Sequence, residues 1–211
     1  MEIKRIQTGN VNCYLVCNGE NAVLVDTGRE NGREKVLDVC RGLHVNLLFL
    51  THGHIDHVQN AAFLAEKLSV PIAMHRADLP LLTDNMAQPL SAGTFLGKIV
   101  LAASVRSFRK DKIEPFAPSV FLKDGDTLDK WGIPASVVGL PGHTAGSLGL
   151  DVEGKHLLVG DALMNMFYPT VSMLYCDERK MLRSAGKISG LRDRTIWFGH
   201  GKPVDNRNWH E

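Results

Sequence analysis

Cysteine is scarce in this chain, and its spacing excludes the usual cysteine-based frameworks. The 211 residues include four cysteines, none of which forms a CxxC pair or a zinc-ribbon spacing. Cys13 and Cys17 fall in one apolar run of strand length, where four residues span about 13 Å, whereas a disulfide needs α-carbons within about 7 Å. The pattern favours reduced thiols and, with them, a cytoplasmic location.

Long apolar runs are also lacking. The N-terminal residues MEIKRIQTGN do not contain the apolar core of about 7–15 residues that a secretory signal needs. No run of about 18 apolar residues occurs anywhere in the chain. These two absences predict a protein that is neither secreted nor membrane-spanning.

The chain also lacks an excess of charge of either sign. The chain has 24 Lys and Arg residues against 23 Asp and Glu residues, for a formal net charge of +1. Such a balance creates no long-range field and no basic stripe to attract nucleic acid or an anionic membrane. We therefore expect a small-molecule substrate as the partner. With 44% hydrophobic and 22% charged residues, the chain suits one globular domain over residues 1–211.

Hydrophobic patterning predicts strands alternating with helices. Runs at 12–18 and 22–26 predict a hairpin, and the continuous apolar run at 45–50 predicts a strand buried on both faces. Helical spacing over 57–68 and a further strand at 70–74 complete an α/β unit. The second half of the chain predicts, in order, a strand at 135–140, a hairpin at 148–152 and 156–159, a helix at 178–191 and a strand at 195–198.

The pattern weakens between Arg76 and Pro118, which predicts a helical insertion over 76–118. This segment carries many apolar side chains, too many to leave in water. They would either form a lid over the site or bury themselves against a second copy in a homodimer. We expect Phe95 and Leu96 to contribute to a substrate pocket or its rim.

Histidine is abundant, and five of the nine histidines sit at ligand spacing. The motif Thr-His-Gly-His-Ile-Asp-His directly follows the predicted strand at 45–50. His52 and His54, two residues apart, can point the same way from an extended segment, while Asp56 and His57 continue around the turn. Two neighbouring metals could therefore each receive one pair. Imidazole and carboxylate are ligands that zinc prefers.

Three companions strengthen this motif. They are His143 after Pro-Gly, Asp161 after Gly and His200 between two glycines, and each follows a predicted strand. Purely structural roles for all seven residues would require five regularly spaced histidines to arise together by chance. The remaining histidines match no motif and are expected to stay outside the site: His44, His75, His156 and His210.

The motifs THGHIDH, PGHTAGS, VGDAL and FGHG, in this order, resemble the metallo-β-lactamase superfamily. Within it the chain is most similar to the hydroxyacylglutathione hydrolase-like (glyoxalase II-like) branch, as a single-domain member. The resemblance implies a four-layer αββα sandwich and two divalent metals, zinc first, with iron or manganese as alternatives.

The resemblance also implies a role for each residue. The first metal would be bound by His52, His54 and His143, and the second by Asp56, His57 and His200. Asp161 would bridge both metals, and Asp56 and Asp161 would be the catalytic acids. Asp26 resembles the family's buried acid that holds the ligand loop by hydrogen bonds; alternatively, it caps a turn with Thr27 and Gly28.

Several relatives differ from this pattern. His54 stands where flavodiiron oxidoreductases carry Glu, and true β-lactamases lack the bridging acid at position 161. Hydroxyacylglutathione hydrolases usually continue into a helical domain that helps to hold glutathione, whereas eleven residues follow His200 here. Glutathione is therefore not assigned as the substrate.

The leading functional prediction is hydrolysis of a thioester, lactone or other ester by a metal-activated water. The alternative is an oxidoreductase resembling the mononuclear iron persulfide dioxygenases, with His52, His143 and Asp161 as iron ligands. A nuclease is disfavoured because the composition offers no basic stripe. A metal-storage or binding module is disfavoured because open positions beside a bridging carboxylate are a catalytic arrangement. Tyr168 and Tyr175 would either donate a hydrogen bond to a substrate carbonyl or pack within their loop.

Overall fold

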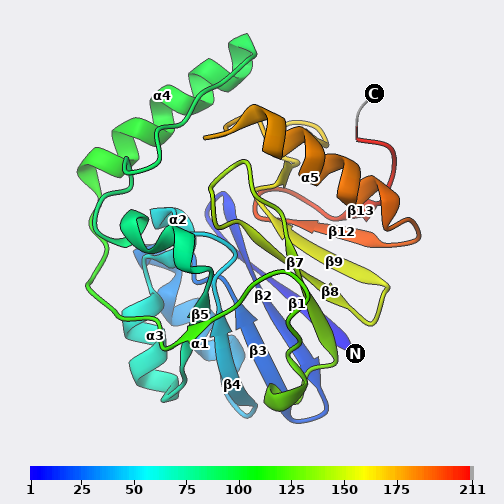
Figure 1. Cartoon of the computed structure of the whole chain (residues 1–211). Helices are drawn as coiled ribbons and strands as arrows, with labels where there is room; N and C mark the ends of the chain where they lie inside the picture. The colour runs from blue at the N-terminus through cyan, green and yellow to red at the C-terminus, as the bar shows by residue number, and fades with distance from the viewer. Residues whose placement is uncertain (210–211) are drawn as a thin grey trace.

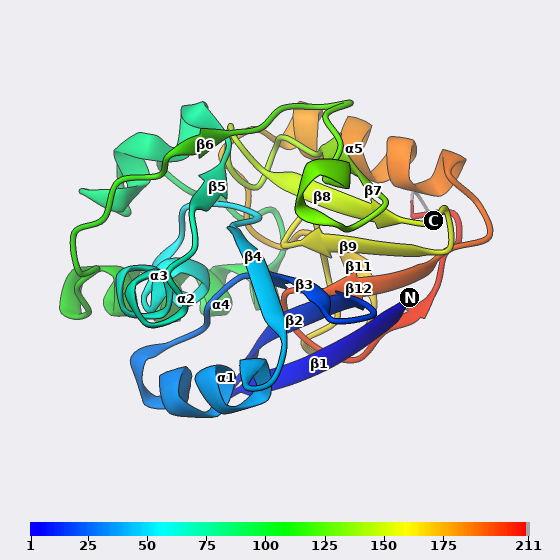
Figure 2. The same cartoon turned by 90° about the horizontal axis from the view of Figure 1, so that it is seen from below.

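The computed structural model describes residues 1–209, and these form two mixed β-sheets packed face to face between outer helices (Figure 1). His210, predicted to stay outside the site, lies outside the described residues. Figure 2 shows four layers, from α1 (Arg33–Cys40) through the two sheets to α5 (Glu178–Gly190). The predicted α/β class and αββα sandwich are confirmed.

The first sheet holds six strands in the order of the sequence. The predicted hairpin is present as its second and third strands, and an unpredicted first strand pairs antiparallel with the second. The third to sixth strands run parallel to one another. The strands are β1 (Glu2–Thr8), β2 (Val11–Asn18), β3 (Asn21–Val25), β4 (His44–Phe49), β5 (Ile72–Met74) and β6 (Val120–Phe121).

The second sheet holds five strands in the order β13-β12-β9-β8-β7. Its first three strands along the chain are antiparallel, and β12 then pairs parallel with β9. The strands are β7 (Ala135–Gly139), β8 (Leu148–Val152), β9 (His156–Gly160), β12 (Thr195–Phe198) and β13 (Val204–Asp205). A separate pair joins β10 (Leu163–Met164) to β11 (Thr170–Val171).

Alternating side chains of the central strands fill the space on both sides of the first sheet. In and just beyond β4, Leu47 and Phe49 belong to the core between the two sheets, whereas Leu48 and Leu50 belong to the core beneath the outer helices. A period of two places successive side chains on opposite faces of a strand. The prediction of a strand buried on both faces is confirmed, and it anchors the loop that follows.

The outer helices cover the sheets through amphipathic faces. α1 and α3 (Ala61–Leu68) pack on the first sheet, and α5 packs on the second. The Asp177 carboxylate caps α5 by accepting from the Lys180 backbone N–H at 3.0 Å. Short 3₁₀ helices are η1 (Glu30–Gly32), η2 (Arg76–Leu82) and η3 (Asp129–Trp131).

The single helix predicted over 57–68 is wrong, because the structure divides this segment into α2 (Ile55–Val58) and α3. Asn60 lies at the break. Its side-chain amide donates to the carbonyls of Thr27 at 2.8 Å and Arg29 at 2.7 Å. The Asn60 side chain at this break therefore connects the ligand segment to the turn after β3.

The segment 76–118 contains η2 and the long helix α4 (Phe95–Lys110). The Thr94 hydroxyl caps α4 by accepting from the Gly97 N–H at 3.0 Å. Gly97 is the only fully buried residue of this helix, which lies at the end of the sandwich near α2, apart from both sheets (Figure 1). α4 therefore adds little to the central cores.

No helix within residues 1–209 has both the length and the apolar character needed to cross a membrane. Cys13 and Cys17 both lie on β2, and all four cysteines are free thiols. Burial raises the pKa of the Cys40 thiol to about 11, so this side chain packs as an apolar residue.

Candidate metal centre

The side chains predicted as metal ligands follow four strand ends. The loop after β4 carries His52 and His54, and the short helix α2 that follows it carries Asp56 and His57. β7, β9 and β12 lead into His143, Asp161 and His200. β7 and β9 both run antiparallel to β8, and β12 runs parallel to β9. The C-terminal ends of β7, β9 and β12 therefore lie at the same end of the second sheet. Rigid strand ends can hold side chains to within fractions of an ångström.

The structure brings all seven residues together, although they come from positions 52 to 200. Six are buried, and Asp56 is partly exposed. Three groups each place their ligand atoms within 4.8 Å of one another. The groups are His52, His54 and His143; Asp56, His57 and His200; and a shared group of His52, His57 and Asp161.

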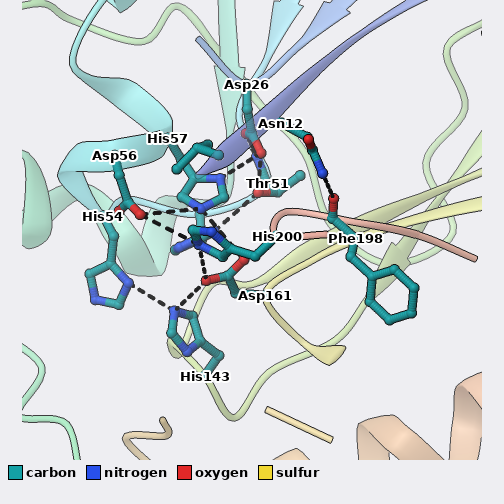
Figure 3. Close-up of polar contacts among 12 residues, drawn as sticks. Asn12, Asp26, Thr51, His54, Asp56, His57, His143, Asp161, Phe198 and His200 are labelled. Atoms are coloured by element: carbon teal, nitrogen blue, oxygen red, sulfur yellow. Dashed lines mark hydrogen bonds and ion pairs between the residues drawn. The ribbon is translucent and has the colours of Figure 1, made fainter. Parts of the chain in front are cut away.

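Asp161 lies between the other members (Figure 3). Its Oδ1 is 3.5 Å from His57 Nε2, and its Oδ2 is 3.3 Å from His200 Nε2 and 3.8 Å from His143 Nε2. Gly199 makes this approach possible, because a β-carbon there would collide with the Asp161 carboxylate. One carboxylate therefore faces both halves of the cluster.

Asp26 lies beneath the ligand loop and binds it at two points. Its Oδ1 accepts from the Thr51 N–H at 2.8 Å, and its Oδ2 lies 2.8 Å from both Thr51 Oγ1 and His57 Nδ1. The backbone of Asp26 is left-handed, with φ of 58°. Such a conformation in a non-glycine residue is commonly retained at functional sites. Asp26 thus directs His57 Nε2 toward the centre.

Three further histidines are oriented from outside. His143 Nδ1 is 2.8 Å from the Leu174 carbonyl, and His200 Nδ1 is 2.7 Å from the Asn10 carbonyl. His52 Nδ1 is 3.1 Å from the Thr51 hydroxyl. Outer contacts of this kind turn Nε2 of each ring toward the centre, where a metal would bind.

The cluster fits a metal, as its unpartnered atoms show. His52 Nε2, His57 Nε2 and Asp161 Oδ1 are buried and have no hydrogen-bond partner among the residues the structure describes. Burying a polar atom without a partner costs about 1–3 kcal/mol per group in proteins. Convergent nitrogen and oxygen atoms of this kind match the ligand preferences of divalent cations such as zinc.

Neighbouring charges divide four of the histidines into two electrostatic classes. Desolvation and the neighbouring imidazoles hold the pKa of His52 well below its usual value, and the same causes lower the pKa of His54 to about 3. Both residues are therefore neutral at pH 7. Neutral imidazole is the form that binds a metal.

The other class is protonated when no metal is present. Although burial lowers it, the adjacent Asp161 carboxylate raises the pKa of His200 to about 10, and Asp161, Asp26 and Asp56 together raise the pKa of His57. Although burial opposes it, these cationic histidines hold the pKa values of Asp56 and Asp161 below their usual range. The acids are therefore ionised and able to bind cations.

Metal binding is expected to release about two protons at pH 7, because His57 and His200 must lose theirs to become ligands. The raised pKa values mean that protons compete with the metal, so apparent affinity should increase as pH rises toward about 10. Titration calorimetry with zinc in two buffers of different ionisation enthalpy measures the release. His200→Gln should release about one proton fewer, and a wild-type release near zero would contradict this charge assignment.

Comparison with known proteins agrees with the geometry. The family model described as the metallo-beta-lactamase superfamily matches residues 6–200. The chain belongs to the metallo-β-lactamase superfamily. An uncharacterised protein of Mycobacterium tuberculosis is 31% identical over 202 residues, which cover 90% of this chain and 85% of that protein. The hydroxyacylglutathione hydrolase GloC of Haemophilus influenzae is 29% identical over 168 residues, covering 77% and 71% of the two chains.

Solved structures share the same architecture. TTHA1623, crystallised in a di-iron-bound form, matches with a TM-score of 0.70 and 26% identity, covering 97% of this chain and 94% of its own. The BLEG-1 B3 metallo-beta-lactamase matches with a TM-score of 0.76 at 22% identity, covering 96% and 93%, which shows the fold alone. Family membership and the His/Asp cluster support a metal-dependent hydrolase at the level of the superfamily.

One buried acid of this metallo-β-lactamase domain was missed by sequence reasoning. Asp78, in η2, accepts from the backbone N–H groups of Gly53 at 3.0 Å and Gly146 at 2.7 Å, and from the Thr144 hydroxyl at 2.7 Å. It therefore joins the loop of His54 to the loop of His143. Its only sequence signal is an acid between apolar residues, which is too common to identify it.

Asparagines also support the ligand loops without forming a sequence motif. Asn85 accepts from the Ile55 N–H at 2.7 Å, and Asn12 donates to the carbonyls of Phe198 at 3.0 Å and Gly201 at 2.7 Å. The Asn12 contact is drawn in Figure 3. Residues nearly 190 positions apart thus hold the loop of His200, and only the folded chain reveals it.

A cleft of about 270 Å³ opens over the cluster. His54, Asp56, His143, Asp161 and His200 form its floor. α4 and the segments around β10 and residue 174 form mostly apolar walls. The apolar wall residues are Leu90, Ile99, Val100, Ala103, Phe108, Met164, Met166, Phe167 and Leu174.

Neither Phe95 nor Leu96 belongs to the cleft lining, so the expectation that they contribute to the pocket itself is wrong, and a place at its rim stays a prediction. Phe95 is 80% exposed at the first turn of α4. The lining residues lie one turn or more further along, where successive turns bring Val100 and Phe108 onto the side facing the metal cluster. α4 therefore forms one wall of the cleft with its middle and C-terminal turns.

The two tyrosines after Asp161 also lie outside the cleft lining. The Tyr175 hydroxyl donates to Glu178 at 3.1 Å, and its backbone pairs with Ser91. Tyr168 is 53% exposed. Packing within the loop therefore accounts for Tyr175, and Phe167 rather than Tyr168 faces the cleft.

Proposed function

We propose that this protein is a two-metal hydrolase that cleaves a thioester, lactone or other ester. The first metal is assigned to His52, His54 and His143, and the second to Asp56, His57 and His200, with Asp161 shared. Zinc is the expected metal, with iron or manganese as alternatives. The similarity to TTHA1623, solved in a di-iron-bound form, supports a binuclear site and is the reason for retaining iron as an alternative metal.

The position of Asp161 carries this proposal. Its carboxylate lies 3.3–3.8 Å from nitrogen atoms of both ligand groups, and the shared group of ligand atoms includes it. A carboxylate between two triads can neutralise two cations about 3.5–4 Å apart. A lone structural acid would not need histidines on both sides.

A pair of divalent cations supplies a water of lowered pKa and polarises a carbonyl oxygen. The protein orients the reacting groups around it. Asp56 is ionised and borders the cleft, so it can accept a hydrogen bond from the attacking water. The apolar walls exclude bulk water and favour an acyl or alkyl group beside the metals.

The single-iron alternative uses a subset of the same ligands, namely His52, His143 and Asp161. It leaves Asp56, His57 and His200 without a metal to bind. These three residues form a compact group of their own, which favours two metals. Metal analysis distinguishes the two hypotheses.

The deciding experiment is metal analysis of anaerobically purified protein, followed by assays with glutathione thioesters, simple thioesters, lactones and aryl esters. We expect about two divalent metal equivalents per chain and hydrolysis of at least one ester class. Similarity to GloC is the reason for including glutathione thioesters. One iron per chain with sulfur-dioxygenase activity and no hydrolysis would reject the proposal.

The residues of the cleft wall should limit the size of the acyl group that the protein accepts as part of its substrate. Val100→Trp adds bulk to a cleft of about 270 Å³ and is expected to lower kcat/KM for long acyl esters about tenfold or more, with acetyl esters and metal content nearly unchanged. Phe95→Ser, on the same helix but outside the cleft, should leave turnover unchanged.

Equal losses for long and short substrates in Val100→Trp would contradict this assignment of the wall. Phe95→Ser also tests the proposed homodimer, since Phe95 is exposed on α4. A shift of this variant from dimer to monomer on size-exclusion chromatography would favour α4 as an interface between copies.

A further inference from the structure

His54 differs from the other four histidines of the site in its outer contacts. Its Nδ1 lies 2.9 Å from His143 Nε2, whereas its Nε2 is buried and has no hydrogen-bond partner within residues 1–209. In Figure 3 this second nitrogen lies on the side of the ring away from the cluster. Ligand imidazoles almost always donate their second N–H to an acceptor that fixes the ring. Within residues 1–209 no acceptor performs this role for His54, and a contact of another kind lies against its ring.

That contact is the ring of Phe108. The two rings are stacked, with centroids 5.0 Å apart and planes at 22°. His52 and His143 meet the His54 ring edge-on instead, at 4.9 and 4.7 Å. Phe108 is thus the aromatic side chain that covers a face of His54, and stacked pairs stabilise by about 0.5–1.5 kcal/mol beyond burial.

The C-terminal turns of α4, which carry Phe108, are tied to the body of the protein. Arg29 Nη1 donates to Ser107 Oγ and to Asp111 Oδ2, both at 2.9 Å, and Ser107 Oγ donates to Asp111 Oδ2 at 2.8 Å. Arg29 follows the turn of Asp26. One anchored network therefore reaches from the base of the ligand loop to the residue beside Phe108.

Phe108 also borders two spaces. It lines the cleft over the cluster and a neighbouring cavity of about 350 Å³. Loss of the ring would enlarge the space beside His54 and uncover the face of the imidazole against which Phe108 stacks. The side chain is consequently placed where it limits both the tilt and the hydration of this imidazole.

We propose that Phe108 is a positioning residue for the first metal, holding His54 by stacking in place of an outer hydrogen bond. The inference rests on the two-metal function proposed above. It means that α4 takes part in assembling the metal centre as well as in lining the cleft. Phe108 contacts no reacting atom and acts through His54.

The test is zinc affinity measured by competition with a chromophoric chelator on the full chain. Phe108→Leu keeps an apolar side chain but removes the stack, and should weaken one of the two zinc sites about tenfold. Phe108→Tyr keeps the ring and should retain affinity within about threefold. Leu101→Ala, on the same helix but outside the cleft lining, is the matched control and should bind both zinc ions as the wild type does.

A double-mutant cycle separates positioning from a general structural effect. In a His54→Gln background, Phe108→Leu should cause no further loss of zinc affinity. Cobalt(II) absorption should change for Phe108→Leu and not for Leu101→Ala. If circular dichroism shows that Phe108→Leu does not fold, Phe108→Met carries the same test, because it also replaces the ring with a flexible apolar side chain.

The outcomes are distinguishable. Wild-type affinity for both zinc ions in Phe108→Leu, or an equal loss in Leu101→Ala, overturns the role of Phe108 while the two-metal centre stands. A further loss in the His54→Gln background also overturns it. A wild-type protein that binds fewer than two metals rejects the proposed function itself.

Discussion

Asp161→Ala is expected to lower kcat/KM by at least about 1,000-fold, equivalent to about 4 kcal/mol of transition-state stabilisation. The substitution removes the one carboxylate that faces both ligand groups, at 3.3 Å from His200 and 3.8 Å from His143. Two cations would then repel each other without a shared anion between them. The second metal should be lost first, because two of its histidine ligands lie nearest to Asp161.

Steady-state kinetics and metal analysis of the same preparation measure both effects. Asp205→Ala, an exposed acid on β13, is the matched control and should retain metal and activity. Asp161→Asn keeps the shape but not the charge, and should be intermediate in metal content. An Asp161→Ala protein that keeps two tightly bound metals and full activity would refute the bridging role.

Asp26→Asn is expected to weaken the second metal site by about 10–100-fold with a smaller loss of stability. The Asp26 carboxylate holds Thr51 and the His57 ring together, with contacts of 2.8 Å. An amide oxygen can still accept from the Thr51 N–H, but an amide nitrogen cannot accept from His57. The substitution should therefore release the His57 ring from its orientation while the ligand loop keeps its contact with Thr51.

Asn suits this position, because it tolerates the left-handed backbone that Asp26 adopts, with φ of 58°. Asp26→Ala adds strain and leaves buried donors unpaired, so it should lower the free energy of unfolding by about 3 kcal/mol. Chelator competition and urea denaturation measure the two quantities separately. Unchanged zinc affinity in Asp26→Asn would mean that His57 does not depend on this acid.

Much of the fold was predictable because it follows local periodicity. Short apolar runs of strand length predicted β2, β3, β4 and the β8–β9 pair, and helical spacing predicted α5. β1 escaped prediction because its side chains are mostly polar or half-buried and lack a strong pattern. The helix over 57–68 was wrongly continuous, because the Asn60 amide binds carbonyls some 30 residues away.

The chemical identity of the candidate centre was determined by the sequence itself. Histidines and acids at close spacing, each following a strand, encode both the ligand types and their nearness to rigid strand ends. The spacing of the first motif therefore predicts that His52 and Asp56 lie in one cluster, and the resemblance to the metallo-β-lactamase superfamily adds Asp161 to it. The spacing within that motif is a local property that does not depend on how the helices and sheets pack.

Only the tertiary structure decided which residues support and enclose that cluster. Asp78 joins Gly53 and Gly146, which belong to two ligand loops 93 residues apart, and Phe108 rather than Phe95 faces His54. Both contacts depend on where η2 and α4 pack, and apolar content alone did not indicate which turn of α4 faces the metals. Each ligand motif is a short run of neighbouring residues, whereas the contacts that bring the motifs together and orient the ligands form only when distant segments meet.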